Sequence, residues 1–136
     1  FKILMKKKIT FIIILLLSGT YFISQFYRVS LGVVAIDITN DLHLNSEELG
    51  RVGGMFFLSF ALAQIPLGIL LDTYNPFKIM IIMLLVIFLG TMLLSISDNL
   101  NFLMIARSLQ GIGCGVCLMG PLVIIAKLSE SKYFSY

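Results

Sequence analysis

Four long apolar segments follow one another along the chain, separated by short polar stretches. The segments cover residues 9–37, 48–71, 78–97 and 101–127. A helix needs about 20 residues to cross the hydrocarbon core of a bilayer, and each segment reaches that length. Inside lipid the backbone polar groups must be satisfied within the protein, and a helix satisfies them within one segment. The pattern therefore predicts an all-α membrane protein with four transmembrane helices.

The polar stretches predict the loops and one helix start. Residues 1–8 precede the first helix, 38–47, 72–77 and 98–100 connect the helices, and 128–136 follow the fourth helix. Asn45 or Ser46 suits the N-cap of the second helix, and Glu47 and Glu48 suit the positive end of its dipole. Because these loops are short, we expect consecutive helices to be antiparallel neighbours.

Basic residues predict the orientation in the membrane. The first connection carries acids and no Lys or Arg before Arg51, and the turn at Asp98 carries no base. Cytoplasmic loops have an excess of Lys and Arg. We therefore expect both ends of the chain and the 72–77 loop on the cytoplasmic side, where the sequence places Lys2, Lys6, Lys7, Lys8, Lys78, Lys127 and Lys132.

The composition excludes several classes of protein. Hydrophobic residues make up 59% of the chain and charged residues 12%, whereas soluble domains carry about 25% charged residues. The formal charge of +3 arises largely from lysines at helix ends, so it does not indicate a nucleic-acid partner. No nucleophile–base set, metal-ligand cluster or phosphate-binding glycine loop is recognisable, and we predict no enzyme, no metal and no cofactor. The start at Phe1 and the stop soon after an apolar segment predict part of a longer protein, with Met5 as the alternative starting residue.

Two short motifs give this helical frame a family resemblance. The stretch between the second and third helices resembles Gly-x-x-x-Asp-(Arg/Lys)-x-Gly-(Arg/Lys)-(Arg/Lys) and its Gly-Pro-Arg-Arg variant, through Gly68, Asp72, Pro76 and Lys78. Thr73, Asn75 and Phe77 depart from that pattern. The fourth helix resembles Arg-x-x-Gln-Gly-x-Gly, through Arg107, Gln110, Gly111 and Gly113. Together the motifs resemble those of the major facilitator superfamily.

The resemblance implies a fold of twelve helices in two six-helix halves around a central cavity, with this chain as the first four helices of the N-terminal half. It implies secondary active transport by alternating access, in a bacterial-type inner membrane. The implied partners are a small-molecule substrate, a proton or counter-ion, membrane lipid and the remaining helices. The stretch containing Gly68, Asp72, Pro76 and Lys78 would be a gating loop, weakened by the lost bases at Thr73 and Phe77.

Two arginines within the apolar segments are the first candidates for chemistry. A charge inside a span costs roughly 3 kcal/mol or more unless it faces water, a partner or a ligand. Arg28 either faces the cavity and binds an anionic group, or marks a membrane boundary; the apolar run from Val29 to Ile36 favours the cavity. Arg107 either lies near the outer boundary or is buried and takes part in proton or substrate coupling, and the resemblance favours burial.

Other polar and small residues complete the predicted site and its packing. Gln25 and Gln64 either line the cavity or bond to a neighbouring helix, and Tyr27 is either a further candidate for the cavity or a lipid-facing or core residue. Glycines four residues apart let helix backbones approach closely. We therefore assign to helix packing Gly50, Gly54, Gln110, Gly111, Gly113 and Gly115. Cys114 and Cys117 are interpreted as small packing residues rather than a redox pair.

The position of Arg28 resembles that of an arginine in the branch of this family that carries organic anions. The resemblance therefore favours an organic anion as the substrate. Efflux of lipophilic compounds by the same fold is the alternative, and the family's signature for it lies on a fifth helix. A small four-helix membrane subunit or scaffold is the alternative from another class, and it leaves both motifs unexplained. A dimeric four-helix drug exporter is a further option, but the carboxylate typical of its first helix is replaced here by Arg28.

Overall fold

The computed structural model describes residues 2–133 and, within them, the side chains of residues 7–127. Four helices account for nearly all of this part of the chain: α1 (Lys2–Leu42), α2 (Ser46–Thr73), α3 (Pro76–Ser95) and α4 (Leu100–Tyr133). Each contains a stretch that is long and apolar enough to cross a membrane. The predicted all-α fold with four membrane-spanning helices is confirmed.

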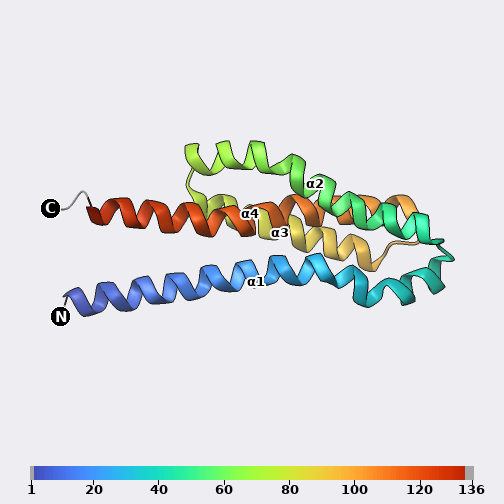
Figure 1. Cartoon of the computed structure of the whole chain (residues 1–136), viewed down its shortest axis with the longest axis horizontal. Helices are drawn as coiled ribbons and strands as arrows, with labels where there is room; N and C mark the ends of the chain where they lie inside the picture. The colour runs from blue at the N-terminus through green and yellow to red at the C-terminus, as the bar shows by residue number, and fades with distance from the viewer. Residues whose placement is uncertain (1, 134–136) are drawn as a thin grey trace.

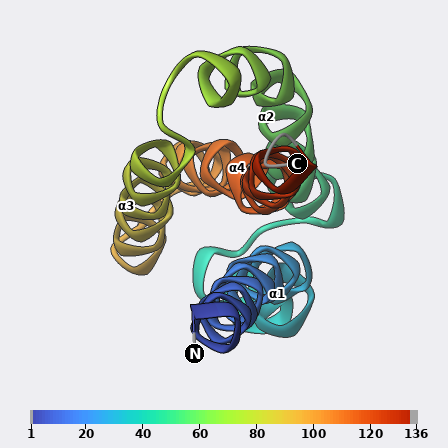
Figure 2. The same ribbon diagram turned by 90° about the vertical axis from the view of Figure 1, so that its left-hand side faces the viewer.

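The helix α4 lies at the centre of the bundle. Viewed end-on, α1, α2 and α3 lie around α4, and α1 is set apart from α3 (Figure 2). Contacts between α4 and the other three helices account for most of the packing, and α1 packs mainly against α4. The start of α1 and the end of α4 lie at the same end of the bundle, as expected for four antiparallel helices (Figure 1).

Glycines on two faces of α4 allow this central position. A Cβ atom at Gly111 would overlap the backbone carbonyl of Phe56 on α2, and one at Gly113 would come 2.7 Å from the carbonyl oxygen of Met83 on α3. Gly120 also faces α3, but there a Cβ would meet the Met80 side chain rather than the backbone. Helices without side chains at such positions pack backbone to backbone, which is the usual means of association in a membrane.

The second helix begins at Asn45, one of the two N-caps that its sequence allows. Asn45 accepts a hydrogen bond from the Glu48 amide, and the Glu48 carboxylate accepts one from the Asn45 amide, both at 2.9 Å. This reciprocal capping box satisfies two backbone donors. Arg51 pairs with Glu47 one turn away, so the ion pair at this end lies within α2. Figure 1 shows α2 changing direction along its length, and Pro66 lies inside it, where it removes one helical hydrogen bond.

The helices extend beyond several predicted loop boundaries. The helix α1 continues to Leu42 and the turn begins at His43, with φ of 51°, so the connection predicted at 38–47 is shorter. Likewise α2 ends at Thr73, α3 covers Pro76–Ser95, and α4 begins at Leu100 and continues past residue 127. Hydropathy marks the part of a helix that suits lipid, whereas the helix itself continues through polar residues such as Asp37 and Asp41. The position of the membrane along the helices stays a prediction.

Much of the apolar surface of the four helices is uncovered. One side of α1 carries a continuous stripe of strongly exposed side chains, namely Phe22, Phe26, Val29, Val33 and Ile36. Such a surface is unfavourable in water and suits lipid or further helices. The chain is therefore an integral membrane protein.

Candidate functional site

Polar side chains from α1, α3 and α4 meet two stacked phenylalanine rings of α2, of which Phe56 is buried and Phe60 is half-buried. We call this group the polar cluster: Tyr27, Arg28 and Ser30 of α1, Phe56 and Phe60 of α2, Thr91 of α3, and Arg107 and Gln110 of α4. Its members come from positions far apart in the sequence and are brought together because α4 is packed against all three neighbours. The cluster contains both arginines that the sequence singles out.

Arg107 is enclosed by the protein. Its side chain is 1% exposed, and its Nη1 atom donates to the Gln110 side-chain oxygen at 3.0 Å and the Tyr27 backbone carbonyl at 3.3 Å. The Ser30 hydroxyl lies 3.5 Å from the same nitrogen. The guanidinium carbon also lies 5.7 Å from the centre of the Phe56 ring. Burial of Arg107 agrees with the interpretation favoured by the sequence, and its contacts join α4 to α1.

Thr91 connects the same group to α3. Its hydroxyl donates to the Ile87 carbonyl at 2.8 Å and lies 3.0 Å from the Tyr27 hydroxyl. The Gln110 amide nitrogen donates to the Thr91 oxygen at 3.2 Å. The backbones of α1 and α3 do not come into contact within the described residues, so the long Tyr27 side chain bridges the gap between these helices.

Arg28 lies against the second ring of the aromatic pair, Phe60, and is partly exposed. Its guanidinium carbon lies 4.4 Å from the centre of the Phe60 ring, and Phe60 stacks on Phe56 with ring centres 6.4 Å apart. Its Nε atom is buried without a hydrogen-bond partner among residues 2–133, whereas its terminal nitrogens are not buried. A cation on an aromatic face gains roughly 0.5–2 kcal/mol, which offsets part of the cost of its position.

The charge in this region is not balanced by the chain's own acids. Arg28 and Arg107 lie in stretches without acids, because residues 9–36, 49–71, 73–97 and 99–127 contain no Asp or Glu. In the described residues the one salt bridge joins Arg51 and Glu47 at the surface. Two cations without an acidic partner in a membrane create a positive field that attracts an anion.

The remaining predicted candidates lie at the edges of the polar cluster. The Gln64 amide nitrogen is buried without a partner among the described residues and lies near Gly115. Gln25 donates to the Tyr21 hydroxyl at 2.6 Å. Ser24, which belongs to neither motif, is buried and donates to the Cys114 carbonyl at 3.3 Å. Tyr27 takes part through both its carbonyl and its hydroxyl.

The glycines assigned to packing fall into two groups. Gly111 and Gly113 are in tight backbone contact, and a Cβ at Gly115 would meet a Leu67 methyl group at 3.1 Å. No described atom lies near the Cβ position of Gly50 or Gly54, so a packing role for these two stays a prediction. Cys114 and Cys117 are buried free thiols on the face of α4 that packs within the bundle.

The predicted gating loop is short, and the basic side chain that contacts the end of α2 beside it belongs to α4. Asp72 and Lys78 are exposed, Pro76 is in the first turn of α3 behind the Asn75 cap, and Gly68 lies against Met119. The last turn of α2 contains no basic residue. Instead, Lys127 of α4 donates to the Leu71 carbonyl at 3.1 Å, where a cation offsets the negative end of the α2 dipole.

Replacing Lys127 with Met is expected to lower the free energy of unfolding by about 0.5–1 kcal/mol, because the α2 carbonyl and dipole lose their cation while the apolar stem is kept. Thermal unfolding of the detergent-purified protein measures the change. The matched control is Lys78→Met, which removes an exposed lysine. Equal melting temperatures for the two variants would show that the Lys127 contact contributes nothing.

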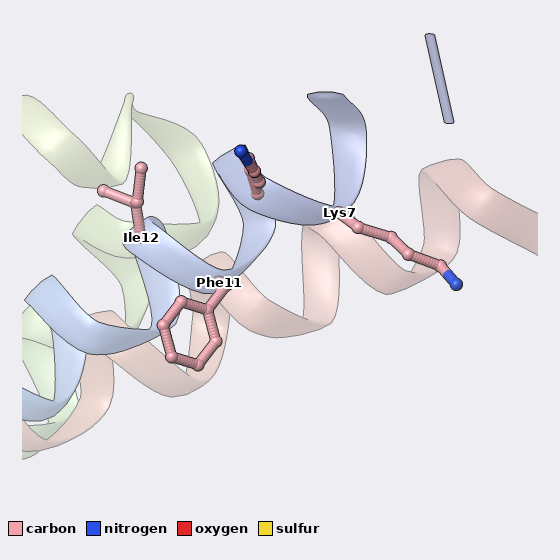
Figure 3. A pocket seen from close by; sticks show the side chains of 4 residues that line it. Lys7, Phe11 and Ile12 are labelled. Atoms are coloured by element: carbon pink, nitrogen blue, oxygen red, sulfur yellow. The ribbon is translucent and has the colours of Figure 1, made fainter. Parts of the chain in front are cut away.

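Two hollows in the surface lie outside the polar cluster. One, of about 400 Å³, is formed by Lys7, Lys8, Phe11 and Ile12 at the amino end of α1. Figure 3 shows Lys7, Phe11 and Ile12 projecting from one helix in different directions, so they do not enclose a ligand. Ammonium groups beside apolar side chains are typical of a helix end at a membrane surface. The other, of about 280 Å³, is an apolar groove between α1 and α4 lined by Leu17, Ser18, Tyr21, Leu118, Pro121, Leu122 and Ile125.

Sequence reasoning missed the residues that organise the cluster. Thr91, Ser30, Phe56 and Phe60 have no motif, and hydroxyl and phenyl groups are common in apolar helices. The one available signal was the spacing of Phe56 and Phe60 by four residues, which puts both rings on one face of a helix.

Comparison with known proteins identifies the class of helical membrane protein to which this arrangement belongs. The family model described as Major Facilitator Superfamily matches residues 17–135. The chain belongs to this superfamily. No solved structure gives a significant match.

Curated relatives agree with the family and are much longer than the chain. A protein of Cupriavidus necator named as a probable sulfoacetate transporter is 32% identical over 95 residues, which are 70% of this chain and 22% of the relative. A protein of Agrobacterium vitis named for tartrate transport is 33% identical over 66 residues, 48% of this chain and 15% of the relative. An uncharacterised transporter of Bacillus subtilis is 40% identical over 60 residues, which are 44% of this chain and 14% of the relative. The chain spans about a fifth or less of the length of these relatives.

Proposed function

We propose that this chain forms one wall of the substrate cavity in a transporter of small organic anions, and that Arg28 binds the anionic group. The observation that carries the proposal is the accessible guanidinium of Arg28 on the Phe60 ring, in a membrane region with no acidic residue beside it. A guanidinium is a planar fork of donors that suits a carboxylate or sulfonate. The names of two relatives, which refer to sulfoacetate and tartrate, support the same chemical class.

In this proposal the chain acts with the remaining helices of a complete transporter, which moves its substrate by alternating access. A proton or counter-substrate gradient supplies the driving force, and both ends of this segment lie on the cytoplasmic side of a bacterial inner membrane. Arg107 contributes to coupling through its contacts with α1 rather than by touching the substrate, because its side chain is covered. Gln25 and Gln64 are the further candidates for contacts with the substrate.

Uptake by the purified complete transporter in proteoliposomes tests the proposal. We expect uptake of radiolabelled sulfoacetate or tartrate above that of protein-free liposomes, and no uptake of the uncharged methyl esters, since the esters cannot form the charge-assisted pair with Arg28. Uptake of neither anion, or accumulation of a lipophilic dye such as ethidium in their place, would contradict an anion site and favour efflux.

A further inference from the structure

We propose that Thr91 is a positioning residue that holds α1 in the rotation at which Arg28 faces the anion. The inference rests on the proposed function for the role of Arg28, and it adds a residue on a third helix that neither motif contains. Three observations carry it: the bonds at the Thr91 hydroxyl, the place where Arg107 joins α1, and the sparse contacts of α1 elsewhere.

The Thr91 hydroxyl is the meeting point of three helices. It has one proton, which goes to the Ile87 carbonyl at 2.8 Å on its own helix. Its lone pairs then accept from the Tyr27 hydroxyl at 3.0 Å and from the Gln110 amide at 3.2 Å. One small side chain thus makes all three bonds, and only the hydroxyls of Thr and Ser combine one donor with two acceptor lone pairs in a side chain of this size.

Both branches from Thr91 end at the same turn of α1. One reaches the Tyr27 hydroxyl directly. The other passes through Gln110, whose side-chain oxygen orients Arg107, and Arg107 donates to the Tyr27 carbonyl. Arg28 is the next residue in the chain, so these hydrogen bonds fix α1 at the residue immediately before the proposed anion-binding side chain. A rotation of α1 that moved Arg28 would break both branches.

Elsewhere α1 has few packing contacts with the other helices. It packs mainly on α4, has few contacts with α2, and does not meet the backbone of α3 in the described residues. Few of its apolar side chains are buried, Leu17 being one. Polar bonds at Tyr27 therefore carry more of the orientation of α1 than they would in a helix that is packed on all sides.

Removal of the Thr91 hydroxyl tests the inference in the complete transporter. Thr91→Val keeps the side-chain shape but leaves the Tyr27 hydroxyl and the Gln110 amide without their acceptor. We expect the KM for sulfoacetate uptake to rise about tenfold, with Vmax within about twofold of the original. Thr91→Ser, which keeps the hydroxyl, should restore the KM to within about twofold.

A second readout needs no substrate. Amide hydrogen exchange of residues 27–32, measured on the ligand-free protein, should be faster in Thr91→Val than in the original protein and unchanged in Thr91→Ser. The matched control is Thr39→Val on α1, because the Thr39 hydroxyl bonds only within its own helix, to Ala35. If Thr91→Val and Thr39→Val behave alike in exchange and in KM, Thr91 does not position α1.

The two proposals fail in different ways. Faster exchange in Thr91→Val together with normal sulfoacetate affinity in Arg28→Gln would overturn the anion site. The proposal that Thr91 positions α1 would remain. Lost affinity in Arg28→Gln with unchanged exchange and KM in Thr91→Val would overturn the positioning role alone.

Discussion

Arg28→Gln is expected to weaken the binding of sulfoacetate or tartrate to the complete transporter by about 30- to 150-fold. The loss corresponds to about 2–3 kcal/mol, the usual contribution of a hydrogen bond to a charged partner that is shielded from water. Glutamine keeps polarity and much of the length, so the change isolates the charge and the fork. Calorimetric titration of the purified protein measures the dissociation constant.

The geometry around Arg28 predicts a graded response. Arg28→Lys keeps the positive charge but loses the planar fork and its flat contact with the Phe60 ring, so we expect about a tenfold loss. Arg51→Gln is the matched control, because Arg51 is exposed and pairs with Glu47 at the end of α2. Binding that is the same in Arg28→Gln and Arg51→Gln would remove Arg28 from the site.

Gly111→Ala is expected to destabilise the protein by about 1–3 kcal/mol or more, the largest effect we expect from adding a single methyl group. The new Cβ would overlap the backbone carbonyl of Phe56, and the next nearest atoms are also backbone, including the Phe60 amide nitrogen. A helix backbone cannot relieve the overlap by changing rotamer, as a side chain can, so α2 and α4 must move apart. The melting temperature of the detergent-purified protein, with the yield of monodisperse protein, measures the effect.

Gly115→Ala provides the comparison. Gly115 lies one turn further along α4, but its added Cβ would meet a Leu67 methyl group at 3.1 Å. That methyl group belongs to a flexible side chain, and alanine is the better helix former by about 0.5–1 kcal/mol. We expect a change within about 1 kcal/mol. Equal destabilisation by the two substitutions would show that the close approach of α2 and α4 at Gly111 is not what limits stability.

These contrasts separate residues that look alike in the sequence. Gly111 and Gly115 belong to one small-residue motif, yet one faces a backbone and the other a side chain. Arg28 and Arg107 are both isolated cations in apolar segments, yet one is accessible on a phenyl ring and the other is enclosed by four groups of its own chain. Function depends on the difference, because only an accessible guanidinium can meet a ligand.

The sequence by itself determined the features that depend on residues close together in the chain. Four membrane-spanning helices, an N-cap at Asn45 or Ser46 and the family motifs could all be predicted, because hydropathy, capping and motif spacing depend on residues close together in the chain. The helices α1 and α4 are longer than the apolar segments that predict them, since an apolar segment indicates the preference for lipid and a helix can continue beyond it.

Only the tertiary structure decided which polar groups meet. The bonds of Tyr27, Thr91, Gln110 and Arg107 join α1, α3 and α4 across separations of up to 80 residues. Each bond depends on the rotation of a helix about its axis, and one residue of α-helix turns the side chain by about 100°. Hydropathy does not fix that rotation when a helix is apolar on every side. The glycines of α4 fix it, because they set how closely α2 and α3 approach and thereby which side chains face the centre.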